Sequence, residues 1–351
     1  MMRSSLLVSG IGMSVALQAQ DYLPILQYHH VSETTPRSTS LSPAEFIGHM
    51  DYLESAGFEV VDLRTALNKI KVNSPLPEKA VAITFDDSYR DIYTGAFPIL
   101  SEREYPFTVF INTEPVLAKR SSALTWEQMK EMEKSGAVFA NHTVNHPYMM
   151  RKEEGETNEA WLSRMTQEVD TVEELLLEKL DFTPKMFAYP YGESNQAIRN
   201  IMKDRGIMAF GQQSGVVSID SDFENLPRFP ASGVYANLAT LKTKLNSQPM
   251  PLLNADAGGD LAGADPVSIR LTFKEGKYRF KDLACYVSGQ GKANLEWTAD
   301  NQVVATAPKA FGTGRGRINC TMPDSTGRSY YWYSNVWIRP AADQHYVSEK
   351  S

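Results

Sequence analysis

The sequence predicts an α/β fold, with a mostly parallel sheet covered by helices, followed by a small all-β domain. Two observations support this prediction. Over residues 22–245 short apolar strands alternate with amphipathic helices, which is the pattern of a parallel sheet, open or barrel-shaped. Beyond a break at residues 249–266 the chain changes to short alternating segments between Gly-rich turns, which is typical of a β-sandwich.

Six apolar segments of the first part are predicted as strands: residues 23–28, 81–85, 107–111, 138–140, 186–189 and 208–210. The helices between them carry start signals. Ser42 before Pro43 caps one helix, and Thr125 with Gln128 forms a capping box for another. The clearest helix covers residues 158–180, where apolar side chains recur at steps of three and four. Functional residues are expected just after the strands, because active sites of such folds lie at the carboxyl ends of the strands.

The second part is predicted to form strands at residues 268–273, 283–287, 293–297, 302–306 and 330–338. Its aromatic run, Tyr330 to Tyr333 with Trp337, could stack on sugar rings, but alternation would bury about half of it, and we favour a core role. Cys285 and Cys320 are the two cysteines of the chain. If the protein is exported, as its N-terminus suggests below, the two cysteines are expected to form one disulfide. Two free buried thiols are the alternative.

Composition excludes some partners. The chain has 351 residues and a formal net charge of -7, with no long run of one sign. Nucleic acids and anionic membranes need clustered Lys and Arg, so we expect neither as the main partner. The formal charge says nothing about oligomeric state.

The N-terminus has the pattern of a signal peptide at residues 1–19. Arg3 precedes a short apolar run, and Ala19 offers a small residue for cleavage; an ordinary buried segment is the alternative. We therefore expect an exported protein, periplasmic or secreted, with no transmembrane segment in the mature chain. The expected organisation is a catalytic domain at 20–248, a linker at 249–266 and an accessory domain at 267–351 that could bind carbohydrate.

Three segments at predicted strand ends carry the candidate chemistry. Asp86 and Asp87 end one strand, His142 and His146 follow another, and a Pro-Tyr-Gly turn at Tyr191 follows a third. Two His and one carboxylate are a common ligand set for a hydrolytic metal. Adjacent Asp residues on an extended backbone point in different directions, so one can bind metal while the other takes a proton from water.

These segments resemble the polysaccharide deacetylase family, carbohydrate esterase family four, also called the NodB-homology domain, over residues 22–245. The resemblance implies a distorted (β/α) barrel and a divalent metal, zinc first, with cobalt or nickel as alternatives. It also implies Asp86 as general base and Asp87, His142 and His146 as metal ligands. The backbone N–H of Tyr191 would stabilise an oxyanion.

The sequence departs from the family pattern at two points. Ala188 replaces an Arg of the third motif, and Arg228 could pair with Asp86 instead. The late Leu-x-x-His motif, the usual source of the general acid, is missing. The early Tyr28-His29 pair resembles the branch that deacetylates biofilm poly-N-acetylglucosamine, in which His29 would be the acid.

The resemblance implies a hydrolase that removes N-acetyl groups from an N-acetylglucosamine-containing polysaccharide or oligosaccharide and releases acetate. Two alternatives remain open at this point. The first is an O-acetyl esterase acting on a xylan-like polysaccharide, which would use the same metal site. The second is a non-catalytic carbohydrate-binding protein with a vestigial site, although all the expected ligands are present.

Overall fold

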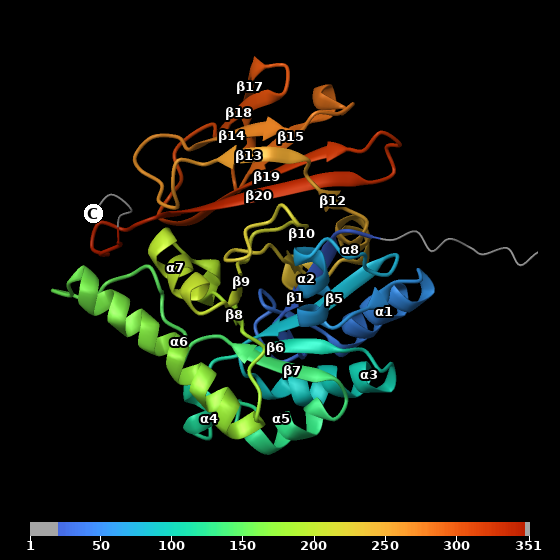
Figure 1. Ribbon diagram of the computed structural model, residues 1–351, viewed down its shortest axis with the longest axis vertical. Coiled ribbons are helices and arrows are strands. Elements are labelled where there is room, and N and C mark those ends of the chain that lie inside the picture. The colour runs from blue at the N-terminus through green and yellow to red at the C-terminus, as the bar shows by residue number, and fades with distance from the viewer. Residues whose placement is uncertain (1–19, 348–351) are drawn as a thin grey trace, which may run out of the picture.

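The computed structural model describes residues 20–347. The predicted signal peptide at 1–19 lies outside the described residues. The chain forms two parts: an α/β part from the N-terminal side, and a β part that lies across one end of it (Figure 1). None of the helices in the described range has the length and apolar character that a membrane span needs.

A nine-stranded sheet forms the centre of the α/β part, in the order β10-β1-β5-β6-β7-β8-β9, with β11 on β1 and β4 on β5. All its pairings are parallel except that of β10 with β1. Its strands are β1 (Leu23–Tyr28), β4 (Glu59–Val60), β5 (Ala80–Asp86), β6 (Phe107–Ile111), β7 (Ala137–Asn141), β8 (Met186–Ala188), β9 (Met208–Phe210), β10 (Val216–Val217) and β11 (Phe229–Pro230). A short parallel pair, β2 (His30–Val31) with β3 (Ser40–Leu41), lies beside it.

The helices begin where the capping signals predict. Ser42 and Glu45 form a capping box at the start of α1 (Pro43–Ser55), and Thr125 with Gln128 does the same for α5 (Trp126–Glu133). The long helix α6 (Asn158–Leu180) has the predicted bounds. The remaining helices are α2 (Leu63–Lys71), α3 (Phe97–Glu102), α4 (Glu114–Leu117), α7 (Gln196–Asp204) and α8 (Leu238–Leu245), with short turns η1 (Ile92–Ala96), η2 (Pro190–Gly192), η3 (Gly233–Tyr235) and η4 (Phe280–Asp282).

Side chains alternate along the strands between two apolar clusters, and the members of these clusters show that the sheet is curled. Val81, Ile83 and Phe85 of β5 face outward, into a cluster that includes apolar residues of α1, α5 and α6. Ala80 and Ala82 face the other way, into a cluster to which β1, β6, β7, β8, β9 and α2 contribute. Strands at both ends of the sheet can share one inner cluster only if the sheet is curled. The predicted distorted (β/α) barrel is confirmed in this form.

The predicted all-β region is also confirmed. It consists of a five-stranded sheet, β12-β20-β19-β15-β16, and a four-stranded sheet, β13-β14-β18-β17. The strands are β12 (Gln248–Pro249), β13 (Leu252–Asp256), β14 (Ser268–Phe273), β15 (Ala284–Val287), β16 (Gly291–Lys292), β17 (Asn294–Ala299), β18 (Gln302–Thr306), β19 (Gly314–Pro323) and β20 (Tyr330–Arg339). Apolar residues of both sheets share one core.

Two features of this region differ from the sequence prediction. Residues 249–266 were expected to be an irregular linker, but they contain β13. This strand pairs with β14 and forms the edge of that sheet. The ten-residue strand β19 was not predicted, since Gly314 and Gly316 interrupt the alternation. The division into domains at 20–248 and 267–351 stays a prediction.

Cys285 and Cys320 form a disulfide between β15 and β19, where they are directly opposite in the ladder. The aromatic run of β20 is used mainly for packing, as favoured from the sequence. Trp337 is buried, Tyr333 packs against the core of the β region, and Trp332 contacts Phe229 of the α/β part.

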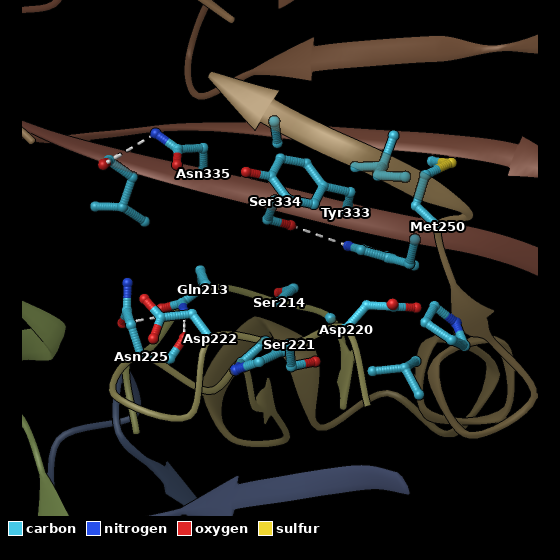
Figure 2. A pocket seen from close by; sticks show the side chains of 18 of the residues that line it. Gln213, Ser214, Asp220, Ser221, Asp222, Asn225, Met250, Tyr333, Ser334 and Asn335 are labelled. Atoms are coloured by element: carbon cyan, nitrogen blue, oxygen red, sulfur yellow. Dashed lines mark hydrogen bonds between the residues drawn. The ribbon is translucent and has the colours of Figure 1, made fainter. Parts of the chain in front are cut away.

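A cavity of about 600 Å³ lies between the two parts. Figure 2 shows Asp220, Ser221 and neighbouring loop residues on one side, and Met250 and Tyr333 of the β part on the other. Most of its wall is polar, and it contains none of the candidate catalytic or metal-binding side chains. The interface between the two parts is therefore not closely packed throughout.

Gly95 allows η1 to lie directly against β2. A Cβ atom at this position would lie 2.3 Å from the Val31 carbonyl oxygen. We therefore predict that Gly95→Ala lowers the free energy of unfolding by about 1–3 kcal/mol, as overpacking of a tight contact does. Urea denaturation measures the change.

Gly48→Ala is the matched control. Gly48 lies within α1, and no atom would lie within 4 Å of an added Cβ. This variant should be neutral or stabilised by about 0.5–1 kcal/mol, because Ala restricts the unfolded chain. Equal stability of the two variants would contradict the close contact at Gly95.

Candidate metal centre

The candidate residues lie at the carboxyl ends of neighbouring strands, as expected for a parallel sheet. Asp86 is the last residue of β5, and His142 directly follows β7. Tyr191 lies in η2, two residues beyond Tyr189 and just after β8. Alternation turns Asp86 toward the interior of the curled sheet, whereas Asp87 follows in a left-handed conformation, with φ 70°. The two neighbouring acids therefore point in different directions.

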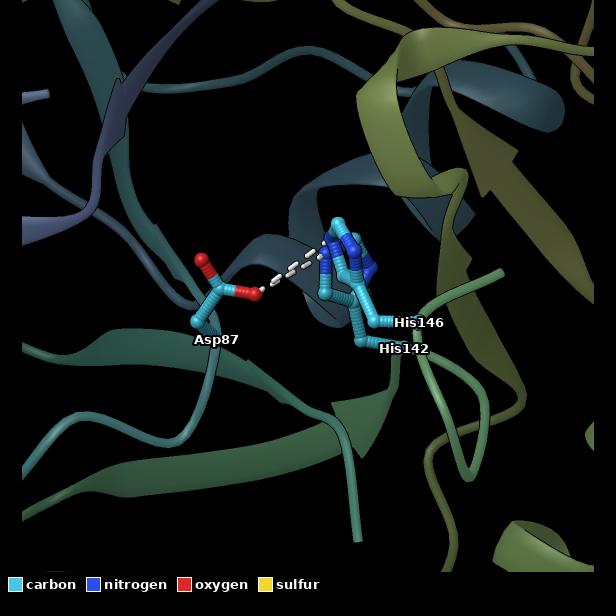
Figure 3. A group of neighbouring side chains, drawn as sticks. All are labelled: Asp87, His142 and His146. Carbon is cyan, nitrogen blue, oxygen red and sulfur yellow. Dashed lines mark ion pairs between the residues drawn. The ribbon is translucent and has the colours of Figure 1, made fainter. Parts of the chain in front are cut away.

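Asp87, His142 and His146 converge on one point (Figure 3). Oδ1 of Asp87 lies 3.6 Å from Nε2 of His142 and 3.5 Å from Nε2 of His146. One atom from each of the three residues lies within 4.8 Å of the others. No other group of His, Cys, Asp and Glu residues within the described range meets this criterion.

The hydrogen bonds of His142 determine which ring nitrogen is available. Its Nδ1 lies 2.7 Å from the carbonyl oxygen of Ala188, which can only accept, so Nδ1 carries the proton. The lone pair of Nε2 then faces Asp87, which is the arrangement of a metal-binding histidine. Burial, followed by the charge of His146, lowers the pKa of His142 to about 3. Burial also lowers the pKa of His146. Both imidazoles are therefore neutral at neutral pH, the form that binds metal.

The three side chains fit a tetrahedral cation. With bonds of about 2.0–2.2 Å, neighbouring ligand atoms of such a site lie about 3.3–3.6 Å apart. The two distances from Asp87 to the imidazoles agree with this spacing and exceed that of a normal hydrogen bond. Three protein ligands would leave a position open for a hydrolytic reaction.

The backbone around these ligands is strained. Asp87, Thr143, His146 and Tyr191 have φ values of 70°, 68°, 54° and 58°. Left-handed conformations are unfavourable for residues with a Cβ, by about 1–3 kcal/mol each, and Thr is among the least tolerant types. Residues held in this way cluster at functional sites.

Hydrogen bonds from α6 and β7 hold the loop that carries the two imidazoles. The Glu168 carboxylate accepts from the backbone N–H groups of Val144 and Asn145, both at 2.9 Å, and from the Asn145 amide at 2.6 Å. Asn141 Oδ1 accepts from the Thr143 N–H at 2.9 Å, and Thr143 Oγ1 accepts from the His146 N–H at 3.0 Å. The strained loop is thus fixed at each end and at its centre.

Asp86 is fully buried and paired with Arg228, which is also fully buried. The guanidinium donates to Oδ1 at 2.6 Å and to Oδ2 at 2.8 Å, and the Gln27 amide donates to Oδ2 at 2.7 Å. Burial raises the pKa of Asp86, but the charges of Arg228 and His142 and the Arg228 hydrogen bonds outweigh it and hold the pKa well below its usual range. Asp86 is therefore ionised at neutral pH, and Arg228 holds it apart from Asp87, His142 and His146.

His29 lies on the other side of Asp86, with Nε2 4.0 Å from Oδ2. Tyr28 before it is held by His49: the His49 Nε2–H donates to the Ala236 carbonyl at 2.7 Å, so Nδ1 accepts from the Tyr28 hydroxyl at 3.0 Å. Burial lowers the pKa of His29, although Asp86 and Asp87 oppose this. His30 is used elsewhere, stacked on Tyr89 and bonded to Asp91.

A cleft of about 620 Å³ opens over these groups. His29, Asp87, His146 and Tyr191 line it, together with Arg315 and Arg317 of β19. The Arg315 guanidinium donates to the carbonyl oxygen of Tyr191 and, at 2.8 Å, to the Gln212 side chain. The Tyr191 ring stacks on Tyr148, with ring centres 3.9 Å apart. The β part therefore holds the turn that contains Tyr191.

All seven residues predicted from the sequence are near one another. Asp87, His142 and His146 form the candidate metal centre, Asp86 pairs with Arg228, and His29 and Tyr191 line the cleft. Four supporting residues were not predicted from the sequence: Gln27, Glu168, Arg315 and Arg317. Gln27 was within the quoted motif around Tyr28, but the others lie in segments with no local signal that points to this site.

Glu168 gives a test of the loop support. We predict that Glu168→Ala weakens zinc binding by about 10- to 100-fold, as loss of groups behind metal ligands commonly does. Calorimetric titration of the metal-free protein with zinc measures the affinity. Glu174→Ala is the control, because Glu174 is an exposed residue of the same helix. Equal zinc affinity of both variants would contradict the role of Glu168.

Comparisons with known proteins identify similar sequences and folds. A family model described as polysaccharide deacetylase matches residues 73–210. The poly-β-1,6-N-acetyl-D-glucosamine N-deacetylase of Escherichia coli K12 is 27% identical over 239 residues, covering 58% of this chain and 35% of that protein. The protein of the same name from Staphylococcus epidermidis is 25% identical over 226 residues, covering 59% and 78%. The chain thus spans about a third of the length of the E. coli relative.

Solved structures show the same fold. IcaB from Ammonifex degensii is 26% identical, with a TM-score of 0.56 over 65% of this chain and 98% of that one. The Streptococcus pyogenes deacetylase PplD, solved with acetate, matches with a TM-score of 0.58 at 24% identity, over 64% and 98%. The family model, the related sequences and the shared fold agree: residues 73–210 are similar to the polysaccharide deacetylase family, and the fold around them is that of solved deacetylases.

Proposed function

We propose that the protein is a metal-dependent hydrolase that removes N-acetyl groups from an N-acetylglucosamine-containing polysaccharide and releases acetate. The observation that carries the proposal is the convergence of Asp87, His142 and His146 beside an ionised acid, Asp86, that Arg228 keeps apart from them. A non-catalytic binding protein would have no use for this separation of roles. The names of the E. coli and S. epidermidis relatives support the N-acetyl substrate.

A divalent metal on Asp87, His142 and His146 would supply the Lewis acidity for the hydrolysis of an acetyl group. The residues around it would then move the protons. The Asp86 carboxylate takes a proton from the attacking water. Arg228 and Gln27 keep that carboxylate ionised and oriented through three hydrogen bonds. Arg228 is a positioning residue in this scheme.

Two further groups complete the proposed reaction. The backbone N–H of Tyr191 stabilises the negative charge that develops on the carbonyl oxygen. His29 donates a proton to the sugar nitrogen as the C–N bond breaks; burial lowers its pKa, which makes its protonated form a stronger acid. The products are a free amine on the sugar and acetate, which keeps one oxygen from water. His29 lies close enough to Asp86 for both to act on one acetamido group in the cleft.

We further propose zinc as the metal, because two imidazoles and one carboxylate suit it. Residues 20–248 would form the catalytic domain, and residues 267–351 the accessory domain. Export to the periplasm or the medium is proposed from the N-terminal sequence pattern, and the Cys285–Cys320 disulfide is compatible with it.

Replacing Asp86 tests the assignment of the base. Asp86→Asn should lower kcat by at least about 10³-fold, since an amide cannot accept the proton. Metal content should stay at one ion per chain by elemental analysis, because the ligands are unchanged. Circular dichroism should check folding, since Arg228 loses its buried partner.

Asp300→Asn is the control for loss of one carboxylate, because Asp300 lies exposed at a turn of the β part. It should retain wild-type turnover. Turnover of Asp86→Asn within tenfold of the wild type would show that another group acts as the base.

A substrate panel tests the reaction itself. Acetate release is measured from β-1,6- and β-1,4-linked N-acetylglucosamine oligomers and from acetylated xylan, with metal-stripped protein as the control. We expect acetate from an N-acetylglucosamine oligomer, its loss on metal removal, and its return with zinc. Acetate from xylan alone would identify an O-acetyl esterase. No acetate from a protein that holds its metal would favour a binding protein.

A further inference from the structure

Three cations gather at one wall of the cleft. Arg315 and Arg317 are two residues apart on β19, so alternation directs both side chains to the same face of the sheet. Both residues line the cleft. Lys244 of α8 lies behind this wall. Its ammonium donates to the Pro230 carbonyl at 2.6 Å and lies 4.5 Å from the ring centre of Tyr235, and Pro230 and Tyr235 both line the cleft.

No acid neutralises these cations. Among the described residues, no ion pair involves Lys244, Arg315 or Arg317. Asp87 is the one acidic residue that lines the cleft, and it belongs to the candidate metal centre. Glu193 is near enough to influence Arg315 but does not contact it. The wall is therefore positively charged, and none of its three cations forms an ion pair with a carboxylate of the described residues.

Two of the three cations have a structural use. Arg315 holds the Tyr191 turn, and Lys244 holds Pro230. Arg317 differs, because no hydrogen bond, ion pair or ring contact of its side chain exists within residues 20–347. A guanidinium in a cleft that binds nothing in the protein keeps its fork of N–H donors free for a ligand.

The crowding of like charges is unfavourable in the protein alone. Burial and then the charge of Arg317 lower the pKa of Lys244 to about 7. Desolvation in the cleft and then the charge of Arg317 also lower the pKa of Arg315, although the residue itself is exposed. A bound anion would relieve this repulsion, because it would supply the missing opposite charge.

We propose that Arg317, supported by Arg315, forms a subsite for an anionic group of the glycan, on a sugar next to the N-acetylated one. Carboxylate and phosphate both match the guanidinium fork. The substrate would then be an acidic polysaccharide. The same wall would disfavour a glucosamine unit, whose ammonium it repels. This inference rests on the proposed function, which it extends from the reaction to the class of polymer.

The test uses pairs of substrates that differ in charge. The N-acetylglucosamine oligomer that the protein hydrolyses best is prepared with one carboxymethyl group, with the methyl ester of that group, and with one phosphate. We expect kcat/KM to be about tenfold higher for an anionic form than for the ester, as for a charge-assisted contact. The anionic form that shows the preference identifies the oxyanion that the subsite takes.

Arg317→Gln should reduce this ratio to near one, and Arg317→Lys should keep part of it because the charge remains. Arg270→Gln is the matched control: Arg270 is exposed on β14, away from the cleft, and its ratio should equal that of the wild type. Salt provides a test that needs no variant, since raising the ionic strength from about 0.05 M to about 0.5 M should shrink the ratio.

The outcomes separate the two proposals. Acetate release at equal kcat/KM from all three forms would overturn the anionic subsite alone. A ratio that Arg317→Gln leaves unchanged, in a protein shown to be folded, would overturn the role of Arg317. Absence of acetate from every form would overturn the proposed function and this inference with it.

Discussion

The buried pair of Arg228 and Asp86 is the contact on which the arrangement of the site depends. Both side chains are fully buried, and two hydrogen bonds join them across 142 positions of the sequence. Isolated buried ion pairs contribute little net stability, because removing two charges from water is costly. The Arg228–Asp86 pair matters instead because it fixes the geometry of the site. Arg228 holds Asp86 ionised and apart from the candidate metal ligands, whereas Asp87 turns toward the two imidazoles.

The strand pattern and the local backbone create this separation together. Period-two alternation directs Asp86 inward, and a left-handed Asp87 directs the next carboxylate to His142 and His146. Such conformations are costly, and an isolated loop would not retain them. They persist because Glu168, Asn141 and the surrounding strands provide fixed hydrogen-bond partners. The large apolar clusters on both faces of the sheet stabilise the scaffold that holds this strain.

Much of this site could be predicted from the sequence, because its main residues follow buried apolar strands. The bounds of β1, β6, β9 and α6 agree with the predicted ranges, since their periodicity and caps are local signals. Contacts made through tertiary structure could not be predicted in this way. Strand β19 was missed because its glycines resemble turns, and with it Arg315 and Arg317 were missed. Strand β13 is defined by pairing with β14 rather than by its own pattern.

The β part is therefore more than an appended module: it supplies both arginines that line the cleft, and one of them, Arg315, holds the Tyr191 turn. The site can act as proposed only if Asp87, His142 and His146 share one cation. A crystal structure of the zinc-loaded protein, with anomalous diffraction at the zinc edge, tests this most directly. It should show one ion bound by those three side chains, with Asp86 still paired to Arg228. An ion bound elsewhere, or an Asp86 that leaves Arg228 to bind the ion, would contradict it.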